Sequence, residues 1–499
     1  MKKLIYILFF PLAALLMVSC EDFLDVNSDP ENLTDDKIDV SLRLASIVEQ
    51  TNDAYGSMAF RISNISQELY RYNSGRNGTR MPYWNPVISD FTWPWQVIFV
   101  NVGSSNRTMI KMALEEGSYH YAGAGMIMEA FGMDFLMAAH GDLIYEEAFQ
   151  PQIIMPKFDD PEELYYALID RVDEGIAQLH KEQAAGVSSL SAGDYLFDGD
   201  VDLWIKFGYG VKARLLQKIT KKAIYDAAAV IDCVNKSFQS VDESPRVDFP
   251  GGDNTNLNSL YGPRQMGSRW VFGDHYVSYF THEYTGAPSP QPALDPRAEF
   301  LLAPNINGEY KGLDFHAELP YYLGYQDSLE CNLAGTYYFG NEKSNELLSY
   351  EELQFIKAEA LFLQNKKGEA LTTMQNVIEA NMRKLGVAEA DITEYLSSNA
   401  LPQSADELTL MNIMTQKFIA LPLGSPERWV DLRRYDYSTD VFPAYQKPTA
   451  AEVPVWYGER YMRRAPTHTY ELQYNEANAI AIGAAEQDYL TKNCWWDEP

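Results

Sequence analysis

Apolar residues recur every three or four positions along most of the chain, which is the spacing of helices that bury one face. The clearest start signal is Asp160, an N-cap carboxylate followed by Pro161 at the first helical position and by Glu163 where a capping box needs it. The apolar face that follows is formed by Leu168, Val172, Ile176 and Leu179. These signals predict a helix over about 161–181.

Two further stretches show the same period. Residues from about 202 to 221 carry apolar side chains close to a single stripe, which predicts one helix. The stretch 350–383 contains two amphipathic segments with Gly368 at the expected turn, which predicts an antiparallel helical hairpin. This hairpin is similar to a tetratricopeptide unit, whose repeat consists of two helices and a turn.

The helical pattern is interrupted at several places. One helix is expected to end before Pro422, and the next to begin with Ser425 as N-cap and Pro426 at its first position. Two longer stretches, about 72–95 and 240–340, are rich in Pro, Gly, Asn and aromatic residues and show weak periodicity. Long irregular stretches in compact domains are commonly functional, so we expect a binding site there.

The N-terminus has the pattern of an export signal. Two lysines precede an apolar run from residue 4 to 18, which would span only about 22 Å as a helix and is short for a membrane span. The run ends at Cys20 after a small residue. It resembles the lipobox of bacterial lipoproteins, in which this thiol is acylated, although Met17 replaces the usual leucine. The alternative is an ordinary secretory signal with an incidental cysteine.

These patterns predict the organisation of the whole chain. We expect a signal peptide over 1–19, a lipidated acidic tether over 20–34 and a single domain over 35–499. Glu21 and Asp22, directly after the cysteine, resemble the acidic signals that send lipoproteins of Bacteroidetes to the cell surface. No stretch beyond the signal is predicted to cross a bilayer.

Composition narrows the range of partners. The formal charge is −30, and loss of Lys2 and Lys3 with the signal would bring it to −32, so nucleic acid and anionic lipid should be repelled. Beyond the anchor the cysteines are Cys233, Cys331 and Cys494. An odd number without a C-x-x-C pair indicates neither a complete disulfide framework nor a zinc site.

Seven segments in order resemble the SusD/RagB family of outer-membrane lipoproteins of Bacteroidetes. They are GDLIYEEAF at 141–149, PKFDDPEELYYALIDRVDEGIAQL at 156–179, FDGDVDLWIKFGYGVKARLLQKI at 197–219, LDPR at 294–297, TQKFIALPLGSPERWVDLRRYDY at 415–437, RRAPTHTYELQYNEANAIAIG at 463–483 and the terminal CWWDEP. The resemblance implies a mostly α-helical fold with four tetratricopeptide-like helix pairs that support a ligand-binding face. It also implies a non-enzymatic protein that captures glycans, or peptides in some members, and covers a SusC-like TonB-dependent transporter.

Sugar binding requires flat apolar faces for the pyranose ring and polar groups for its hydroxyls. In the first irregular stretch the candidate platforms are Tyr83 and Trp84, whereas Trp93 and Trp95 are expected in the core. In the second stretch the candidate platforms and their polar partners are Tyr261, Trp270, Tyr276, Asp253, Asn254, Asn256, Arg264 and Arg269. For each of these, packing that anchors a loop is the competing role.

Motifs for metal or catalytic chemistry are incomplete. Asp198, Asp200 and Asp202 suggest a calcium loop, but Leu203 stands where an EF-hand needs glycine, so helix capping is expected instead. An H-E-x-x-H pattern begins at His282 and fails at Gly286. No cofactor or metal is therefore expected. A surface-tethered glycan or peptide hydrolase remains the alternative, because 70 acidic residues always contain some possible catalytic pair. The family resemblance is what argues against it.

Overall fold

The computed structural model describes residues 38–71, 81–250, 258, 269–317 and 322–499, and it is mostly helical. The helices of its first half are α3 (Val40–Ile65), α5 (Thr92–Gln96), α6 (Gly103–Glu116), α7 (Tyr119–His140), α8 (Pro161–Leu179), α9 (Val201–Lys218) and α10 (Ala227–Lys236). Those of its second half are α12 (Asp274–Thr281), α13 (Ala298–Leu301), α14 (Tyr350–Leu363), α15 (Lys367–Leu385), α16 (Glu389–Ser397), α17 (Leu410–Ala420), α18 (Glu427–Arg434), α19 (Thr469–Tyr474) and α20 (Glu476–Ala481).

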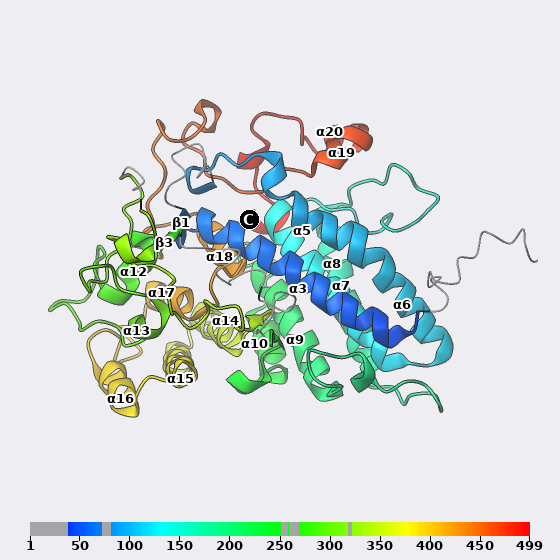
Figure 1. The fold of residues 1–499 in the computed structure, drawn as a ribbon, viewed down its shortest axis with the longest axis horizontal. Coiled ribbons are helices and arrows are strands. Elements are labelled where there is room, and N and C mark those ends of the chain that lie inside the picture. The colour runs from blue at the N-terminus through cyan, green and yellow to red at the C-terminus, as the bar shows by residue number, and fades with distance from the viewer. Residues whose placement is uncertain (1–37, 72–80, 251–257, 259–268, 318–321) are drawn as a thin grey trace, which may run out of the picture.

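Two very short antiparallel sheets accompany the helices. β1 (Leu69–Arg71) pairs with β3 (Trp270–Phe272), and β2 (Arg246–Val247) pairs with β4 (Asn345–Glu346). In the first sheet Tyr70 lies opposite Val271, so a segment near the N-terminus is joined to the second irregular stretch. Figure 1 shows β1, β3 and α12 at one end of the molecule, on the left of the view, away from α6.

The helices pack as successive neighbours. α7 packs on α8, α9 on α10 and α14 on α15, while α8 packs on α9 and α10 on α14, so these hairpins form one continuous stack. α7 is its central helix, because every residue from Tyr121 to His140 is buried. It alone among the described helices has the length and apolar composition of a membrane span, contrary to the expectation from sequence, but it lies wholly inside the protein. Core helices have this same composition.

The predicted helices are present, with shifted ends. The Asp160 carboxylate accepts hydrogen bonds from the amides of residues 162 and 163, as an N-cap should, and α8 ends at Leu179. Gly368 lies inside the first turn of α15, so the turn of the hairpin comes just before the predicted position, at 364–366. α18 begins after Pro426, which is itself the N-cap, so the assignment of that role to Ser425 is wrong.

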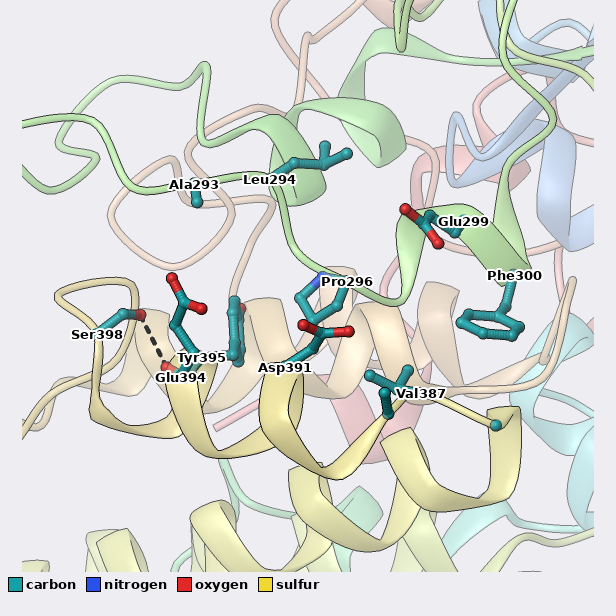
Figure 2. Close-up of a pocket in the computed structure, with 12 residues that line it drawn as sticks. Ala293, Leu294, Pro296, Glu299, Phe300, Val387, Asp391, Glu394, Tyr395 and Ser398 are labelled. Atoms are coloured by element: carbon teal, nitrogen blue, oxygen red, sulfur yellow. Dashed lines mark hydrogen bonds between the residues drawn. The ribbon is translucent and has the colours of Figure 1, made fainter.

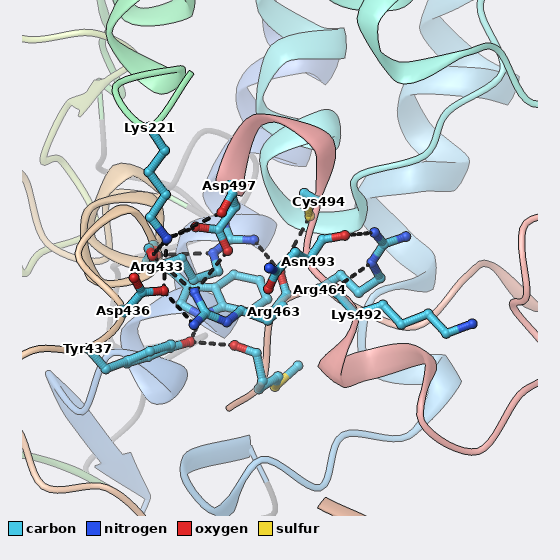
Figure 3. Close-up of polar contacts among 12 residues, drawn as sticks. Lys221, Arg433, Asp436, Tyr437, Arg463, Arg464, Lys492, Asn493, Cys494 and Asp497 are labelled. Carbon is cyan, nitrogen blue, oxygen red and sulfur yellow. Dashed lines mark hydrogen bonds and ion pairs between the residues drawn. The ribbon is translucent and has the colours of Figure 1, made fainter. Parts of the chain in front are cut away.

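The C-terminal segment is held in the core by ionic and aromatic contacts (Figure 3). The buried Asp497 carboxylate pairs with Lys221 and with Arg463, each at 2.9 Å. The Arg433 guanidinium lies 3.7 Å from the ring centre of Trp429 and 4.6 Å from that of Trp496. Arg433 also donates hydrogen bonds to the carbonyls of residues 429, 463 and 138. Arg433 and the terminal Trp496 therefore have structural roles.

Buried ion pairs link the helices of the stack. The neighbouring Arg434 pairs with Glu359 at 2.6 Å and with Asp431 at 2.6 Å, and all three side chains are almost completely buried. Lys218 pairs with Asp134 of α7 at 3.2 Å. Each charge is therefore paired within the core, and removing one partner would leave the other charge uncompensated.

Candidate ligand-binding face

A small aromatic cluster, separate from the main core, lies at the β1 and β3 end of the molecule. Its members are Tyr70, Tyr83, Val271, Leu313, Phe315 and Tyr322. The Tyr83 and Phe315 ring centres are 5.0 Å apart. Chain segments from three parts of the sequence meet in this cluster because β1 pairs with β3 and because the loop carrying Phe315 returns beside them.

The four aromatic side chains proposed as platforms and described by the structure are buried. Tyr83, Trp84, Trp270 and Tyr276 expose only 5%, 0%, 5% and 2% of their surfaces. Trp270 meets Phe60 edge to face at 4.7 Å. Their burial contradicts the expectation of exposed platforms, and the physical reason is that each ring packs against other rings and so attaches its short segment to the core.

Of the polar candidates, the structure describes only Arg269. Its side chain is exposed directly before β3. The remaining candidates lie outside the described residues and stay predictions: Tyr261, Asp253, Asn254, Asn256 and Arg264. In the first irregular stretch, Trp95 is buried as expected, but Trp93 exposes 45% of its surface and donates from Nε1 to Asp53 at 2.9 Å, so its core assignment is wrong.

Buried Trp84 is the centre of a second group of aromatic rings that reaches the surface. Its ring centre lies 6.2 Å from Tyr457 and 5.5 Å from Tyr461. Trp456 stacks on Tyr457 at 4.3 Å, with 23° between the ring planes, and is partly exposed. Tyr461 is also partly exposed, and Lys447 Nζ lies 4.2 Å from its ring centre. These two outer rings, both partly exposed, were not among the candidates from sequence; Pro454 and Gly458, which flank Trp456, could have indicated a loop there.

One polar contact joins two loops at this end of the molecule. His316 Nδ1 lies 3.1 Å from a Glu452 carboxylate oxygen, and the backbone amide of Thr449 donates to the same carboxylate at 2.8 Å. Burial opposes ionisation of Glu452, but these hydrogen bonds keep its pKa below the ordinary value. The loops that carry Phe315 and Trp456 are thus fixed to one another.

A polar cavity of about 480 Å³ lies beside α12, and we call it the α12 cavity. Its walls are formed by Asp274, Ser278, His282, Glu283, Tyr284, Thr285, Gln291, Pro443, Ala444, Tyr445 and Gln446. Tyr445 connects the cavity to the ring group, because its ring centre lies 5.3 Å from that of Tyr437, which itself stacks on Tyr461 at 4.9 Å.

The electrostatics of the α12 cavity favour a neutral, hydroxyl-rich ligand. Burial, and then the nearby Asp314 carboxylate, raise the pKa of Asp274. A carboxylate accepts hydrogen bonds from the hydroxyl groups of a ligand. Tyr284, partly exposed, provides an apolar ring in the same wall. A ring face with such groups around it is the combination that sugar recognition requires.

The other motifs have structural roles. Asp200 caps α9 by accepting from the amide of Leu203, as expected. Among the described residues no group of His, Cys, Asp and Glu could hold a metal ion. Cys233, Cys331 and Cys494 are buried free thiols.

The comparisons with known proteins agree with this fold. A family model described as SusD-like, starch-binding and associating with the outer membrane matches residues 33–457, and the chain belongs to this SusD-like family. No curated protein matches the chain.

Three solved structures illustrate the likeness. A SusD/RagB family protein of Bacteroides thetaiotaomicron is 22% identical, with a TM-score of 0.71 over 92% of this chain and 99% of that chain. A chitin-binding protein is 20% identical, with a TM-score of 0.75 over 92% of this chain and 100% of that chain. A chitin-binding SusD homolog from Flavobacterium johnsoniae is 18% identical, with a TM-score of 0.68 over 91% of this chain and 98% of that chain. At these identities the structures establish the fold alone.

Proposed function

We propose that this protein is a cell-surface lipoprotein that captures oligosaccharides and delivers them to a SusC-like TonB-dependent transporter in the outer membrane. Membership in a family described as starch-binding and outer-membrane-associated is the observation that carries the proposal. The outer rings Trp456 and Tyr461 and the neighbouring α12 cavity support it, because together they offer ring faces and hydroxyl-recognising groups. Peptides are the second ligand class to test.

Ligand binding is tested with the soluble chain from residue 21 onward. Starch-derived and chitin-derived oligosaccharides and a peptide panel are titrated by calorimetry against the parent protein and a Trp456→Ala variant. Loss of one ring-stacking contact with the ligand should weaken binding by about 1 kcal/mol, or roughly fivefold. Trp93→Ala is the matched control, because Trp93 is also a partly exposed tryptophan and lies on α5. Unchanged affinity in the Trp456 variant would remove this ring from the proposed face.

The anchor and the partner need separate experiments in the native host. We propose that residues 1–19 are removed as a signal peptide, that 20–34 form a lipidated tether and that 35–499 fold as one domain. Cys20→Ser should then release the protein from membranes. Co-purification of an outer-membrane transporter with the wild-type protein should reveal the SusC-like partner, and its absence under gentle detergent extraction would contradict delivery.

A hydrolase is the second candidate function, and the raised pKa of Asp274 beside Asp314 is what favours it, since a general acid needs a raised pKa. Incubation of the same glycans and peptides with wild-type protein and with Asp274→Asn distinguishes the two functions. Binding without product in both proteins supports capture. Product formation that disappears in the variant would establish the hydrolase.

A further inference from the structure

A second cavity lies between α16 and the chain segment that leads into α13, and we call it the α16 groove (Figure 2). It has a volume of about 480 Å³ and shares no lining residue with the α12 cavity. Figure 2 shows Asp391 and Glu394 rising from α16 toward the segment that carries Pro296 and Glu299. The proposed glycan function does not use this groove.

The two walls of the groove are attached to each other by a buried network. The Asp295 and Arg297 side chains, both fully buried, form an ion pair at 2.6 Å. Arg297 also donates to Gln416 of α17, whose amide in turn donates to the Tyr395 hydroxyl of α16 at 3.1 Å. Asn399, just beyond α16, donates to the Pro290 carbonyl at 2.7 Å. A groove whose walls are fixed in this way is preorganised, so a ligand need not order it.

The floor of the groove is apolar. It consists of Pro296, Phe300, Val387 and the ring of Tyr395. Tyr395 and Val387 are buried, and Phe300 is partly exposed with its edge close to the turn at Gly386. Apolar floors of this size hold one or two large side chains.

The rim, in contrast, is acidic on both sides. Glu299 stands on one wall, and Asp391 and Glu394, one helical turn apart, stand on the other. All three are exposed, and among the described residues no ion pair involves any of them. The nearest arginines along the chain are already paired, Arg297 with Asp295 and Arg383 with two other glutamates. The described residues contain no carboxylate group compact enough for a metal ion, so the rim fits an extended cation.

We propose that the α16 groove is a docking site for a basic segment of a partner protein, with an apolar or aromatic side chain on the floor and lysine or arginine side chains against the rim. Charge complementarity selects this occupant, because three carboxylates without an ion-pair partner among the described residues surround an apolar floor. An anionic ligand would be repelled by the rim. A neutral sugar would leave the three carboxylates unpaired.

The test uses the soluble chain and a fluorescein-labelled pentapeptide, KLKYK, with QLQYQ and ELEYE as charge controls. Binding is followed by fluorescence anisotropy at two salt concentrations. We expect saturable binding of the basic peptide alone, weakened by salt because exposed charges are screened. Absence of saturable binding up to millimolar peptide overturns the proposal.

Two sets of variants locate the binding. Glu299→Gln, Asp391→Asn and Glu394→Gln combined should weaken the peptide about tenfold or more, since each exposed ion pair contributes a modest amount. The matched control removes three exposed carboxylates on or just after α8, with Glu162→Gln, Asp170→Asn and Glu182→Gln, and should leave affinity unchanged. Equal weakening in both sets would show attraction to the overall negative charge, and unchanged affinity in the first set would place the peptide elsewhere; either result overturns the proposal.

The floor and the class of occupant are tested in the same assay. Phe300→Ala should weaken the peptide at least threefold if its ring lies under the apolar side chain, and unchanged affinity would contradict that contact. Spermidine, at the same concentration of positive charge, should fail to displace the peptide. Displacement by spermidine would assign the groove to simple cations and overturn the peptide assignment. Circular dichroism and thermal unfolding of every variant confirm that the fold is intact.

Discussion

Replacing Trp84 by alanine should destabilise the fold and weaken ligand binding less than Trp456→Ala does. The ring is fully buried and has three aromatic neighbours, with ring centres 5.5 Å from Tyr437, 5.5 Å from Tyr461 and 6.2 Å from Tyr457. Truncating a buried tryptophan removes its transfer free energy and leaves a cavity, which together lower the free energy of unfolding by about 3–5 kcal/mol. For the roughly 430 residues that the structure describes, the unfolding entropy is about 0.9 kcal/mol per kelvin, so the melting temperature should fall by about 3–5 °C.

The backbone at Trp84 sharpens this prediction. Its φ of 52° lies in the left-handed region, where an L-residue is strained and glycine is not. Trp84→Gly should therefore be more stable than Trp84→Ala by about 1 kcal/mol, the reverse of the usual order. The measurement is urea unfolding followed by circular dichroism, with Trp93→Ala as the exposed control, expected within about 1 kcal/mol of wild type.

Calorimetric titration with the best ligand from the oligosaccharide screen completes the comparison. A Trp84→Ala protein with unchanged unfolding free energy and lost affinity would refute the packing argument. It would restore Trp84 as a ligand platform.

Three further predictions concern buried polar groups. Burial lowers the pKa of His275 to about 3, so the imidazole stays neutral in the folded protein, whereas in the unfolded chain it binds a proton below its ordinary pKa near 6.5. The free energy of unfolding should therefore fall as the pH decreases from 6.5 toward 4. In chemical denaturation, His275→Gln should reduce this slope by about 1.4 kcal/mol per pH unit. An unchanged slope would mean that His275 is accessible in the folded protein. Glu359→Met should cost about 3–5 kcal/mol because it breaks a buried ion pair and leaves Arg434 with Asp431 as its one carboxylate partner, whereas Glu359→Met with Arg434→Met should cost less than the two single replacements added together; additive losses in this double-mutant cycle would contradict a buried pair. Asp497→Asn should lower the melting temperature by about 2–4 °C, and an unchanged scan would show that the C-terminal segment contributes little.

Much of the helical scaffold could be predicted because its signals are local. Asp160, Pro161 and the apolar stripe after them define α8 within a single stretch of sequence. The observed helix differs from the predicted one only at its C-terminal end. Helix boundaries at Gly368 and Ser425 were less accurate, because a glycine is tolerated inside a first turn and because Pro426 itself took the cap position.

The candidate face could be predicted only in outline. Its approximate location in two irregular stretches follows from composition, but the exposure of each ring does not. The same irregular stretch of sequence contains Trp84, which is buried, and Trp93, which is partly exposed. Trp456, in the segment between α18 and α19 and outside the two irregular stretches singled out from sequence, carries one of the outer ring faces.

The sequence by itself determined the helical class, the order of the main helices, the family and the expectation of export, because periodicity, caps and signal patterns depend on neighbouring residues. Only the tertiary structure decided which aromatic rings are buried in the core and which lie at the surface. The partners that bury Trp84 are Tyr437 and Tyr461, near the opposite end of the chain, and a local pattern contains no information about such distant contacts. Burial in an irregular loop is a property of the assembled fold, whereas burial on a helix face is repeated in the sequence itself.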